Sequence, residues 1–275
     1  MNDNIKISII TISYNEKLSI KNTILSVINQ TYYNKEYIVI DGGSTDGTLE
    51  IIKKYSPKID VFVSEPDKGI YDAMNKGIDF ASGDYCIFMN AGDVFVNDNV
   101  LTKSAPYFRS SLDVYNGFTY YVHKGRIKGY RKPPTKVDLS FFYCSSICHQ
   151  SSFIKTSLLK KYHYDDNCRY VADGKFWKIV LGLNNGTYKA INVDISCFDM
   201  GGRSNTQSNK AKMEDVLVKQ ELLSSEQIES CEKNRKKWNN KFNLKRRFDG
   251  LMRRLLLLYA IIFKQNSLKY LNKNN

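Results

Sequence analysis

Residues 85–93 read Tyr-Cys-Ile-Phe-Met-Asn-Ala-Gly-Asp, an apolar run that stops at an amide, two small residues and an acid. Shortly before it, residues 65–77 read Glu-Pro-Asp-Lys-Gly-Ile-Tyr-Asp-Ala-Met-Asn-Lys-Gly, which predicts a helix with a polar N-terminus. A buried strand that ends in a short polar turn presents oxygen ligands at the carboxyl edge of a sheet, where α/β proteins bind metals and diphosphates. The two segments therefore predict an α/β protein with a ligand site at Asn90–Asp93.

Strand-like and helix-like segments alternate along the first ninety residues. Ile5–Ser13 is an almost unbroken apolar run, which is typical of a central strand buried on both faces. The predicted order continues with a helix up to Gln30, a strand at Tyr37–Ile40, a helix after Thr48, a strand at Ile59–Val63, a helix at Ile70–Phe80 and a strand at Tyr85–Met89. This alternation predicts a central, mostly parallel sheet with right-handed crossovers, flanked by helices.

The remainder of the chain has a different pattern. We expect antiparallel strands between Asp113 and Tyr130, helices at Ser151–Tyr162 and Lys175–Leu183, and a late strand at Tyr188–Phe198. Helical patterns dominate from Asn209 onward. We therefore expect one main domain at residues 1–208 and a basic helical extension at residues 209–275.

The net charge of +13 is concentrated at the C-terminal end. The segment from Lys233 to the C-terminus contains thirteen Lys or Arg residues and one acid, Asp249. The preceding 232 residues are therefore nearly neutral, and we expect them to have no nucleic acid partner. Within Lys241–Phe263, the nine apolar residues 255–263 are far fewer than the ~20 that a membrane-spanning helix needs. The segment predicts a basic helix that lies on an anionic membrane surface; the alternative is a helix that packs on the protein's own body.

The six cysteines are irregularly spaced, and no secretory signal precedes the first strand pattern. Free thiols in a reducing cytoplasm are the expectation. A zinc site built from Cys144, Cys148, His149, His163 and Cys168 is disfavoured because the spacing is irregular and two of the cysteines fall in apolar surroundings.

Four segments in register resemble one protein family. They are Ile9-Ile10-Thr11-Ile12-Ser13-Tyr14-Asn15-Glu16, Ser26-Val27-Ile28-Asn29-Gln30-Thr31, Asp41-Gly42-Gly43-Ser44-Thr45-Asp46-Gly47-Thr48, and Asp67–Asn75 with Asn90-Ala91-Gly92-Asp93. Over about residues 5–205 the chain is similar to family 2 glycosyltransferases with the GT-A fold, and to a subgroup found in bacterial O-antigen, capsule and colanic-acid gene clusters.

The resemblance implies an inverting transfer of a hexose or N-acetylhexosamine from a nucleotide sugar, usually UDP-linked, with Mn²⁺ or Mg²⁺ as cofactor. It also implies a lipid-linked acceptor on a polyisoprenoid diphosphate, and hence a cytoplasmic enzyme of surface polysaccharide or lipopolysaccharide biosynthesis that is peripheral on the inner face of the cell membrane. The alternative is a non-catalytic sugar-nucleotide-binding or scaffold protein of the same pathway. A dinucleotide oxidoreductase is disfavoured because no Gly-x-Gly-x-x-Gly turn follows the first strand.

Asp93 is the predicted metal ligand, because Mg²⁺ and Mn²⁺ prefer oxygen donors held on a short rigid turn. The family pattern at this place is Asp-x-Asp-Asp, whereas the chain has Asn90-Ala91-Gly92-Asp93. Asn90 and Ala91 are expected to line the donor site, and Asn90 can reach a ribose or a metal-bound water, but Gly92 cannot bind a metal. The departure predicts a weak metal site; the alternative is a plain β-turn.

The other predicted contacts to the nucleotide sugar lie at strand ends and around one helix start: Thr11, Tyr14 and Glu16, Asp41, and Asp67, Lys68, Gly69, Asp72 and Asn75. Arg203, in a Gly-rich segment, is expected to close on the diphosphate. Alternatives stay open: ordinary β-propensity for Thr11, a turn acid for Asp41, a solvated helix face for Asp72 and Asn75, and a surface arginine for Arg203.

Asp173 is the predicted catalytic base. It lies in Tyr170-Val171-Ala172-Asp173-Gly174-Lys175-Phe176-Trp177, a region where the resembled family carries the acid that takes the proton from the acceptor hydroxyl. An inverting displacement needs a base opposite the leaving diphosphate, and a carboxylate suits that role. The alternative is a helix N-cap. His149-Gln150 resembles a His-Gln pair of the subgroup and is expected on the acceptor or metal side, with a structural histidine as the alternative.

Overall fold

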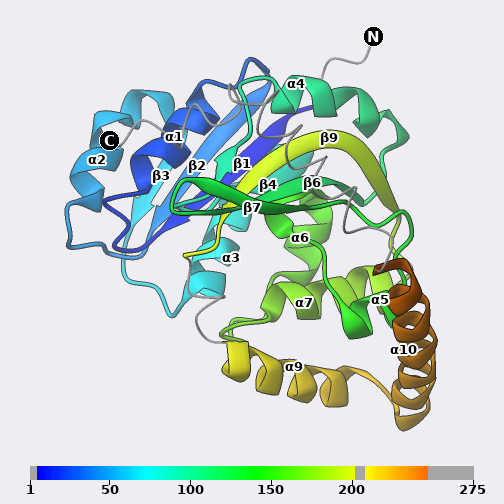
Figure 1. Ribbon diagram of the computed structural model, residues 1–275. Helices are drawn as coiled ribbons and strands as arrows, with labels where there is room; N and C mark the ends of the chain where they lie inside the picture. The colour runs from blue at the N-terminus through cyan, green and yellow to red at the C-terminus, as the bar shows by residue number, and fades with distance from the viewer. Residues whose placement is uncertain (1–4, 202–207, 247–275) are drawn as a thin grey trace.

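The computed structural model describes residues 5–201 and 208–246 (Figure 1). In this part of the chain nine strands form one sheet with the order β3-β2-β1-β4-β8-β6-β9-β5, and β7 pairs with β6. The strands are β1 (Ile7–Ser13), β2 (Lys35–Asp41), β3 (Val61–Ser64), β4 (Tyr85–Phe88), β5 (Val94–Phe95), β6 (Val114–His123), β7 (Arg126–Arg131), β8 (Ser152–Lys155) and β9 (Tyr188–Asp199).

The N-terminal half of the sheet is parallel, as predicted. β1 pairs with β2 and with β4, and β2 pairs with β3, all in parallel. Every residue of β1 is buried, which confirms that it is a central strand covered on both faces. Because β1, β2 and β4 run in the same direction, the polar segments that follow them emerge at one edge of the sheet.

The second half of the sheet is mixed, and one predicted element there is wrong. Residues 152–155, expected to begin a helix at Ser151–Tyr162, form β8, which pairs antiparallel with both β4 and β6. The helix begins only at Thr156. A short apolar run is compatible with either a strand or a helix. Residues 152–155 form a strand because β4 and β6 lie on either side of them and pair with them.

Helices cover both faces of the sheet (Figure 1). Ile7 and Ile9 of β1 pack with one set of helices, whereas Ile10 and Ile12 face the other set. The first set is α1 (Ile20–Ile28), α2 (Thr48–Lys54) and α4 (Val100–Ser104). The second set is α3 (Ile70–Phe80), α5 (Leu139–Cys144), α6 (Thr156–Tyr162) and α7 (Ala172–Trp177), which continues as a π-helical segment at Lys178–Leu183.

Two further helices, α9 (Ser208–Leu222) and α10 (Ser225–Arg246), follow β9 in the chain and pack beside α7 and α5 (Figure 1). Lys178 of the π-helical segment is buried and forms a 2.7 Å ion pair with Asp215 of α9, and Cys231 of α10 packs near Tyr143 of α5. Of the predicted basic segment Lys241–Phe263, the part after Arg246 lies outside the described residues. None of the helices within residues 5–201 and 208–246 has the length and apolar character to cross a membrane.

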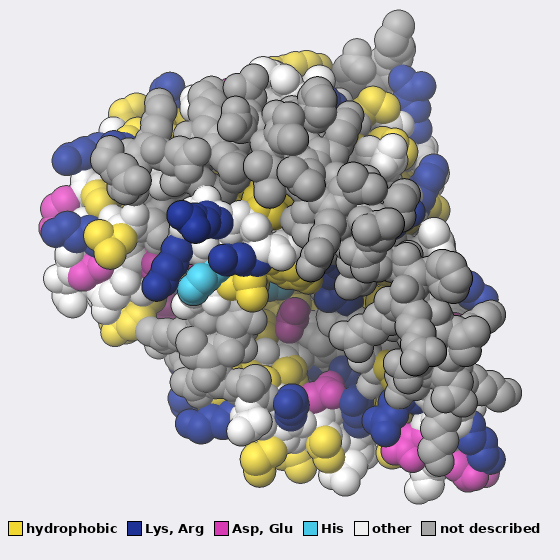
Figure 2. Space-filling view, in the orientation of Figure 1, with side chains coloured by type: hydrophobic (Ala, Val, Ile, Leu, Met, Phe, Trp, Pro, Cys, Tyr) yellow, Lys and Arg dark blue, Asp and Glu magenta, His cyan; other side chains and the backbone are white. Residues whose placement is uncertain are grey.

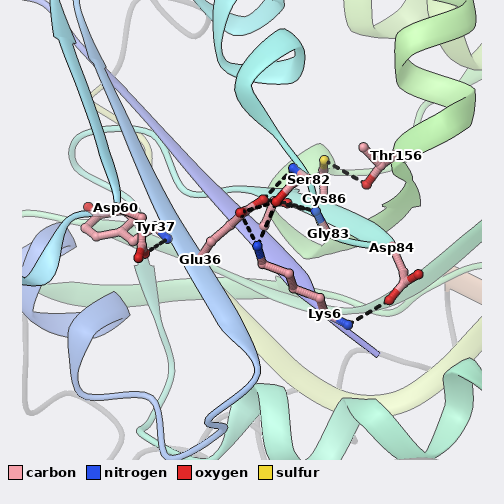
Figure 3. A network of polar contacts seen from close by, with 10 residues as sticks. Lys6, Glu36, Tyr37, Asp60, Ser82, Gly83, Asp84, Cys86 and Thr156 are labelled. Carbon is pink, nitrogen blue, oxygen red and sulfur yellow. Dashed lines mark hydrogen bonds and ion pairs between the residues drawn. The ribbon is translucent and has the colours of Figure 1, made fainter. Parts of the chain in front are cut away.

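Glu36 joins the amino-terminal ends of three strands to the end of α3 (Figure 3). Its carboxylate accepts hydrogen bonds from the Ser8 hydroxyl and from the backbone N–H groups of Ser82 and Gly83, and it forms a 2.6 Å ion pair with Lys6. Burial alone would raise the pKa of Glu36, but these partners outweigh it and lower the pKa to about 2. The cluster fixes the edge of the sheet opposite to the predicted ligand site.

Candidate active site

The Asn90–Asp93 turn is anchored on two elements. The backbone N–H of Ala91 donates to the Ile12 carbonyl at 3.0 Å, so the turn continues alongside β1 beyond the end of β4. The Thr23 hydroxyl of α1 accepts from the Gly92 N–H and donates to the Asp93 carbonyl, at 3.0 and 2.8 Å. Gly92 has a φ of +103°, which favours glycine. The turn is therefore held rigidly enough to orient a ligand.

Asp93 is a buried carboxylate with few compensating partners. Its side chain is 4% exposed, and Oδ1 accepts the backbone N–H of Asp199 at 3.0 Å. Burial raises the pKa of Asp93 to about 7, against the lowering effects of the Asp199 N–H, of His149 and of a hydrogen bond from Gln150. Gln150 thus contacts the predicted metal ligand directly.

Asp173 and the Asn90–Asp93 turn are joined through His149. His149 Nδ1 lies 3.5 Å from Asp173 Oδ2, and Nε2 lies 3.3 Å from Asn90 Nδ2. The Tyr71 hydroxyl of α3 donates to Asp173 Oδ1 at 3.1 Å. The His149 and Asp173 side chains are 14% and 23% exposed, so both remain accessible from the surface.

The surroundings of Asp173 keep it ionised. Burial would raise the pKa of this carboxyl, but His149, the Gly174 N–H and Tyr71 outweigh burial and lower it. The N-cap alternative is wrong, because α7 begins at Ala172 and its N-cap is Val171. Lys175 of α7 is buried and forms ion pairs with Asp165 and Glu221, both at 2.6 Å, which hold α7 behind this carboxylate.

Tyr14 and Asp67 meet over the end of β2. A Cβ added to Gly42 would lie 2.2 Å from Asp67 Oδ2 and 3.3 Å from the Tyr14 ring, so both side chains rest against this glycine. Burial, Asp72 and Asp41 act to raise the pKa of Asp67. Tyr14 is 46% exposed. An accessible aromatic face beside an acid suits a nucleotide base and its N–H or hydroxyl donors.

The side chains of Thr11 and Asp41 are used within the protein. Thr11 is fully buried, and its hydroxyl donates to the Met89 carbonyl at 2.8 Å. Asp41 is also fully buried and accepts from the N–H groups of Gly43 and Ser44, at 3.0 and 2.8 Å, and from Ser64. These contacts favour the structural alternative for Thr11 and the turn-acid alternative for Asp41.

Three other predicted residues also hold local structure. Glu16 accepts the Ser19 hydroxyl at 2.5 Å just before α1. Asp72 accepts the Lys68 N–H at 3.0 Å at the start of α3 and forms a 3.4 Å ion pair with Lys76. The Asn75 side-chain amide both donates to and accepts from the Tyr164 backbone, at 2.8 and 2.9 Å. Asn75 is therefore joined to a distant segment of the protein, whereas the contacts of Asp72 are local to the start of α3.

Of the remaining predicted residues, Lys68 and Gly69 are exposed before α3, and Arg203 lies outside the described residues.

Figure 2 shows an acidic side chain recessed near the middle of the face drawn, with Lys, Arg and His side chains beside it.

Sequence reasoning did not single out two residues of this region, Tyr71 and Asp199. Tyr71 lies inside the Asp67–Asn75 motif, and its place in the first turn of the helix after a polar segment was a usable signal. Asp199 ends the late strand, and an acid at a strand end is a common feature that the sequence alone gives no reason to select.

A parallel sheet with a polar turn after β4 and an acid at the start of α7 is the architecture of nucleotide-sugar transferases with the GT-A fold, and solved structures of that class superpose on the chain. TarS 1–349 from S. aureus in complex with UDP-GlcNAc superposes with a TM-score of 0.61 at 19% identity, covering 78% of this chain and 65% of that one. The mannosyltransferase PcManGT from Pyrobaculum calidifontis, in complex with GDP-Man and Mn²⁺, superposes with a TM-score of 0.58 at 15% identity, covering 76% and 61%. These likenesses establish the fold.

The family model described as Glycosyl transferase family 2 matches residues 8–186, so the chain belongs to glycosyltransferase family 2. An uncharacterized glycosyltransferase of Mycobacterium tuberculosis strain H37Rv is 34% identical over 178 residues, which are 62% of this chain and 66% of that protein. A PGL/p-HBAD biosynthesis glycosyltransferase of Mycobacterium bovis strain BCG is 35% identical over 85 residues, 30% of this chain and 33% of that protein. The chain thus spans just under two thirds of the first relative's length and a third of the second's.

The donor set at the turn fits a divalent metal of the kind that this fold commonly uses. No group of three His, Cys, Asp or Glu side chains within residues 5–201 and 208–246 is arranged to enclose an ion. The turn instead offers hard oxygen donors: the Asp93 carboxylate and Asn90 Oδ1, a buried atom with no hydrogen-bond partner among the described residues. Mg²⁺ is typically bound in this way, by one or two carboxylates together with substrate phosphates and water.

Proposed function

We propose that the chain is an inverting glycosyltransferase that moves a hexose or N-acetylhexosamine from a nucleotide sugar, preferably UDP-linked, to a lipid-linked glycan. The observation that carries the proposal is the connection of Asp173 to the Asn90–Asp93 turn through His149, over distances of 3.5 and 3.3 Å. It brings an ionised carboxylate next to the turn that offers oxygen donors for a metal and a diphosphate. Family 2 membership supports the reaction class.

In the proposed mechanism, Tyr14 and Asp67 hold the base and ribose, and Asp93 and Asn90 face the diphosphate. A divalent cation held there would neutralise charge that develops on the leaving nucleoside diphosphate. Asp173 takes the proton of the acceptor hydroxyl, whose oxygen forms the new bond to the anomeric carbon as the bond to the diphosphate breaks. Attack from the face opposite the leaving group inverts the configuration. Tyr71 and His149 orient the Asp173 carboxylate.

The wider setting is proposed from the sequence. We propose a polyisoprenoid-diphosphate-linked acceptor in O-antigen, capsule or related polysaccharide synthesis, with the C-terminal basic segment on the inner face of the cell membrane. Phosphate headgroups attract juxtamembrane Lys and Arg residues by about 1 kcal/mol each. Co-sedimentation of the full chain with anionic and with neutral lipid vesicles tests the membrane contact, and equal binding to both would contradict it.

Replacing Asp173 with Asn tests the reaction. Asp173→Asn keeps the size of the side chain but cannot take a proton, so kcat should fall by about 10²–10⁴-fold, while the affinity for UDP stays within about twofold. Release of UDP from a panel of UDP-sugars, with a short lipid-diphosphate saccharide as acceptor, is the measurement. Full activity of the variant would remove Asp173 from the mechanism. Binding of UDP-sugars by the wild-type chain without UDP release, across the panel, would favour the non-catalytic alternative.

A further inference from the structure

The end of β9 lies against the Asn90–Asp93 turn. The backbone N–H of Asp199, the last residue of β9, donates to Asp93 Oδ1 at 3.0 Å. A Cβ added to Gly92 would stand 3.7 Å from the Asp199 Cβ and 3.8 Å from its Oδ2. The Asp199 side chain therefore lies where residue 92 of the turn carries no side chain of its own.

The resembled family has an Asp at the position of Gly92, and this chain lacks it. We propose that Asp199 supplies the missing carboxylate from β9, so that Asp93 and Asp199 together hold the divalent cation of the donor diphosphate. The inference rests on the proposed function and adds a ligand that sequence reasoning did not select. Gly92 has a φ of +103°, which side chains rarely adopt, and a carboxylate from the neighbouring strand avoids that strain.

The charges of the pair support a cation between them. Within residues 5–201 and 208–246, neither Asp93 nor Asp199 forms an ion pair with a Lys or Arg side chain. The two acids are in direct contact, since the Asp199 backbone N–H donates to Asp93 Oδ1 at 3.0 Å, and like charges held close to one another repel. A divalent cation would relieve this repulsion, and the orphaned Asn90 Oδ1 offers a further oxygen in the same turn.

The orientation of Asp199 is fixed by its own backbone turn. Its Oδ1 accepts the Gly201 N–H at 2.9 Å, and no described residue donates to Oδ2, the oxygen near Gly92. An Asn at this position keeps the Oδ1 acceptor and loses the charge. Asp199→Asn therefore separates metal binding from the structure of the turn.

The experiment measures metal affinity by titrating Mn²⁺ calorimetrically into the full chain at saturating UDP. The proteins are wild type, Asp199→Asn, Asp93→Asn and the control Asp166→Asn, which changes an exposed acid outside the site. We expect Asp199→Asn to weaken Mn²⁺ binding by about tenfold, which corresponds to about 1.4 kcal/mol, and the control to match wild type. UDP binding without metal should be as tight in Asp199→Asn as in wild type or tighter, because the variant removes a negative charge near the diphosphate.

The outcomes separate the inference from the proposed function. Wild-type Mn²⁺ affinity in Asp199→Asn, together with a loss in Asp93→Asn, would overturn the role of Asp199 and leave the proposed function standing. A wild-type chain that binds UDP but no Mn²⁺ would overturn both the role of Asp199 and the metal-assisted mechanism. If Asp199→Asn lowers the melting temperature, Asp199→Glu decides: recovery of stability without recovery of Mn²⁺ affinity contradicts the inference, and recovery of both supports it.

Discussion

Tyr71 shows how one hydroxyl can act on the ionisation of a distant carboxylate, here the proposed base Asp173. The side chain is buried, and its hydroxyl donates to Asp173 Oδ1 at 3.1 Å from a helix that is 102 residues away in sequence. This hydrogen bond acts to lower the pKa of Asp173 and restricts the rotation of its carboxylate. In the proposed mechanism Tyr71 is a positioning residue.

We predict that Tyr71→Phe lowers kcat by about tenfold and shifts the acidic limb of the kcat/KM profile to higher pH. The shift follows because the lost hydrogen bond no longer stabilises the ionised form of Asp173. The pKa of Asp173 therefore rises, and the carboxylate is protonated and inactive as a base at a higher pH than in the wild type. The measurement is UDP release across a pH series, with UDP affinity as the control. A lower kcat with an unchanged acidic limb would assign Tyr71 a purely structural role.

Among the elements, the turn after β2 connects the sheet to the side of the site that is proposed to bind the nucleotide. The Asp41 carboxylate organises this turn through the Gly43 and Ser44 N–H groups. Asp67 and Tyr14, from two other segments, then converge on Gly42. The close approach of Asp67 is the reason that residue 42 is a glycine. Backbone conformation is not the reason, because Gly43, and not Gly42, lies in the left-handed region.

Gly42→Ala should weaken UDP binding by about tenfold, because the new Cβ would stand 2.2 Å from Asp67 Oδ2 and the carboxylate must move. Gly129→Ala in β7 is the matched control, since nothing lies within 4 Å of its added Cβ. Both affinities are measured by calorimetric titration, with melting temperatures to confirm folding. Equal UDP affinities of the two variants would show that the Asp67 position does not matter for nucleotide binding.

In the molecule as a whole, the two edges of the sheet differ in how far their buried carboxylates are stabilised by partners. The carboxyl edge holds Asp93, a buried carboxylate whose pKa is raised, and the amino edge holds Glu36, whose carboxylate is paired and hydrogen-bonded and whose pKa is lowered (Figure 3). Burial of a carboxylate costs free energy unless it is paired and hydrogen-bonded, so the Glu36 edge contributes to stability whereas the burial of Asp93 is costly. The helices α9 and α10 add ion pairs and apolar contacts behind α7 and α5.

Glu36→Gln should lower the free energy of unfolding by on the order of 3 kcal/mol at pH 7, because the pKa of Glu36 falls from its ordinary 4.5 to about 2 on folding. A lowered folded-state pKa gives stability that is complete above the unfolded-state value and is lost as pH falls from 4.5 through about 2. The difference between wild type and variant in urea unfolding should therefore shrink over that range. Glu50→Gln, at an exposed acid, is the control. A difference that does not change with pH would contradict the assigned cause.

The local pattern of the sequence was sufficient for the parallel half of the sheet. Buried strands and amphipathic helices repeat with periods that a short segment already contains, and Ile70–Phe80 agrees with α3 at both ends. Local reasoning also selected Asp93, because an acid after an apolar run is visible in a few residues, whereas Asp173 was selected through the resemblance to family 2 glycosyltransferases. The structure connects Asp173 through His149 to Asn90, which begins the turn that carries Asp93.

The partners of buried polar groups followed from contacts between distant segments. Residues 152–155 form β8 because β4 and β6 lie on either side of them. The side chains of Thr11, Asp41 and Asn75 form hydrogen bonds within the protein. Asp199 reaches Asp93 across 106 residues of sequence. Periodicity reports which face of an element is buried, whereas the partner that satisfies a buried oxygen or nitrogen depends on which other segment folds against it. For that reason the strands and helices of the parallel half could be located from the sequence, whereas β8 and the arrangement of acids around the turn were decided by the tertiary fold.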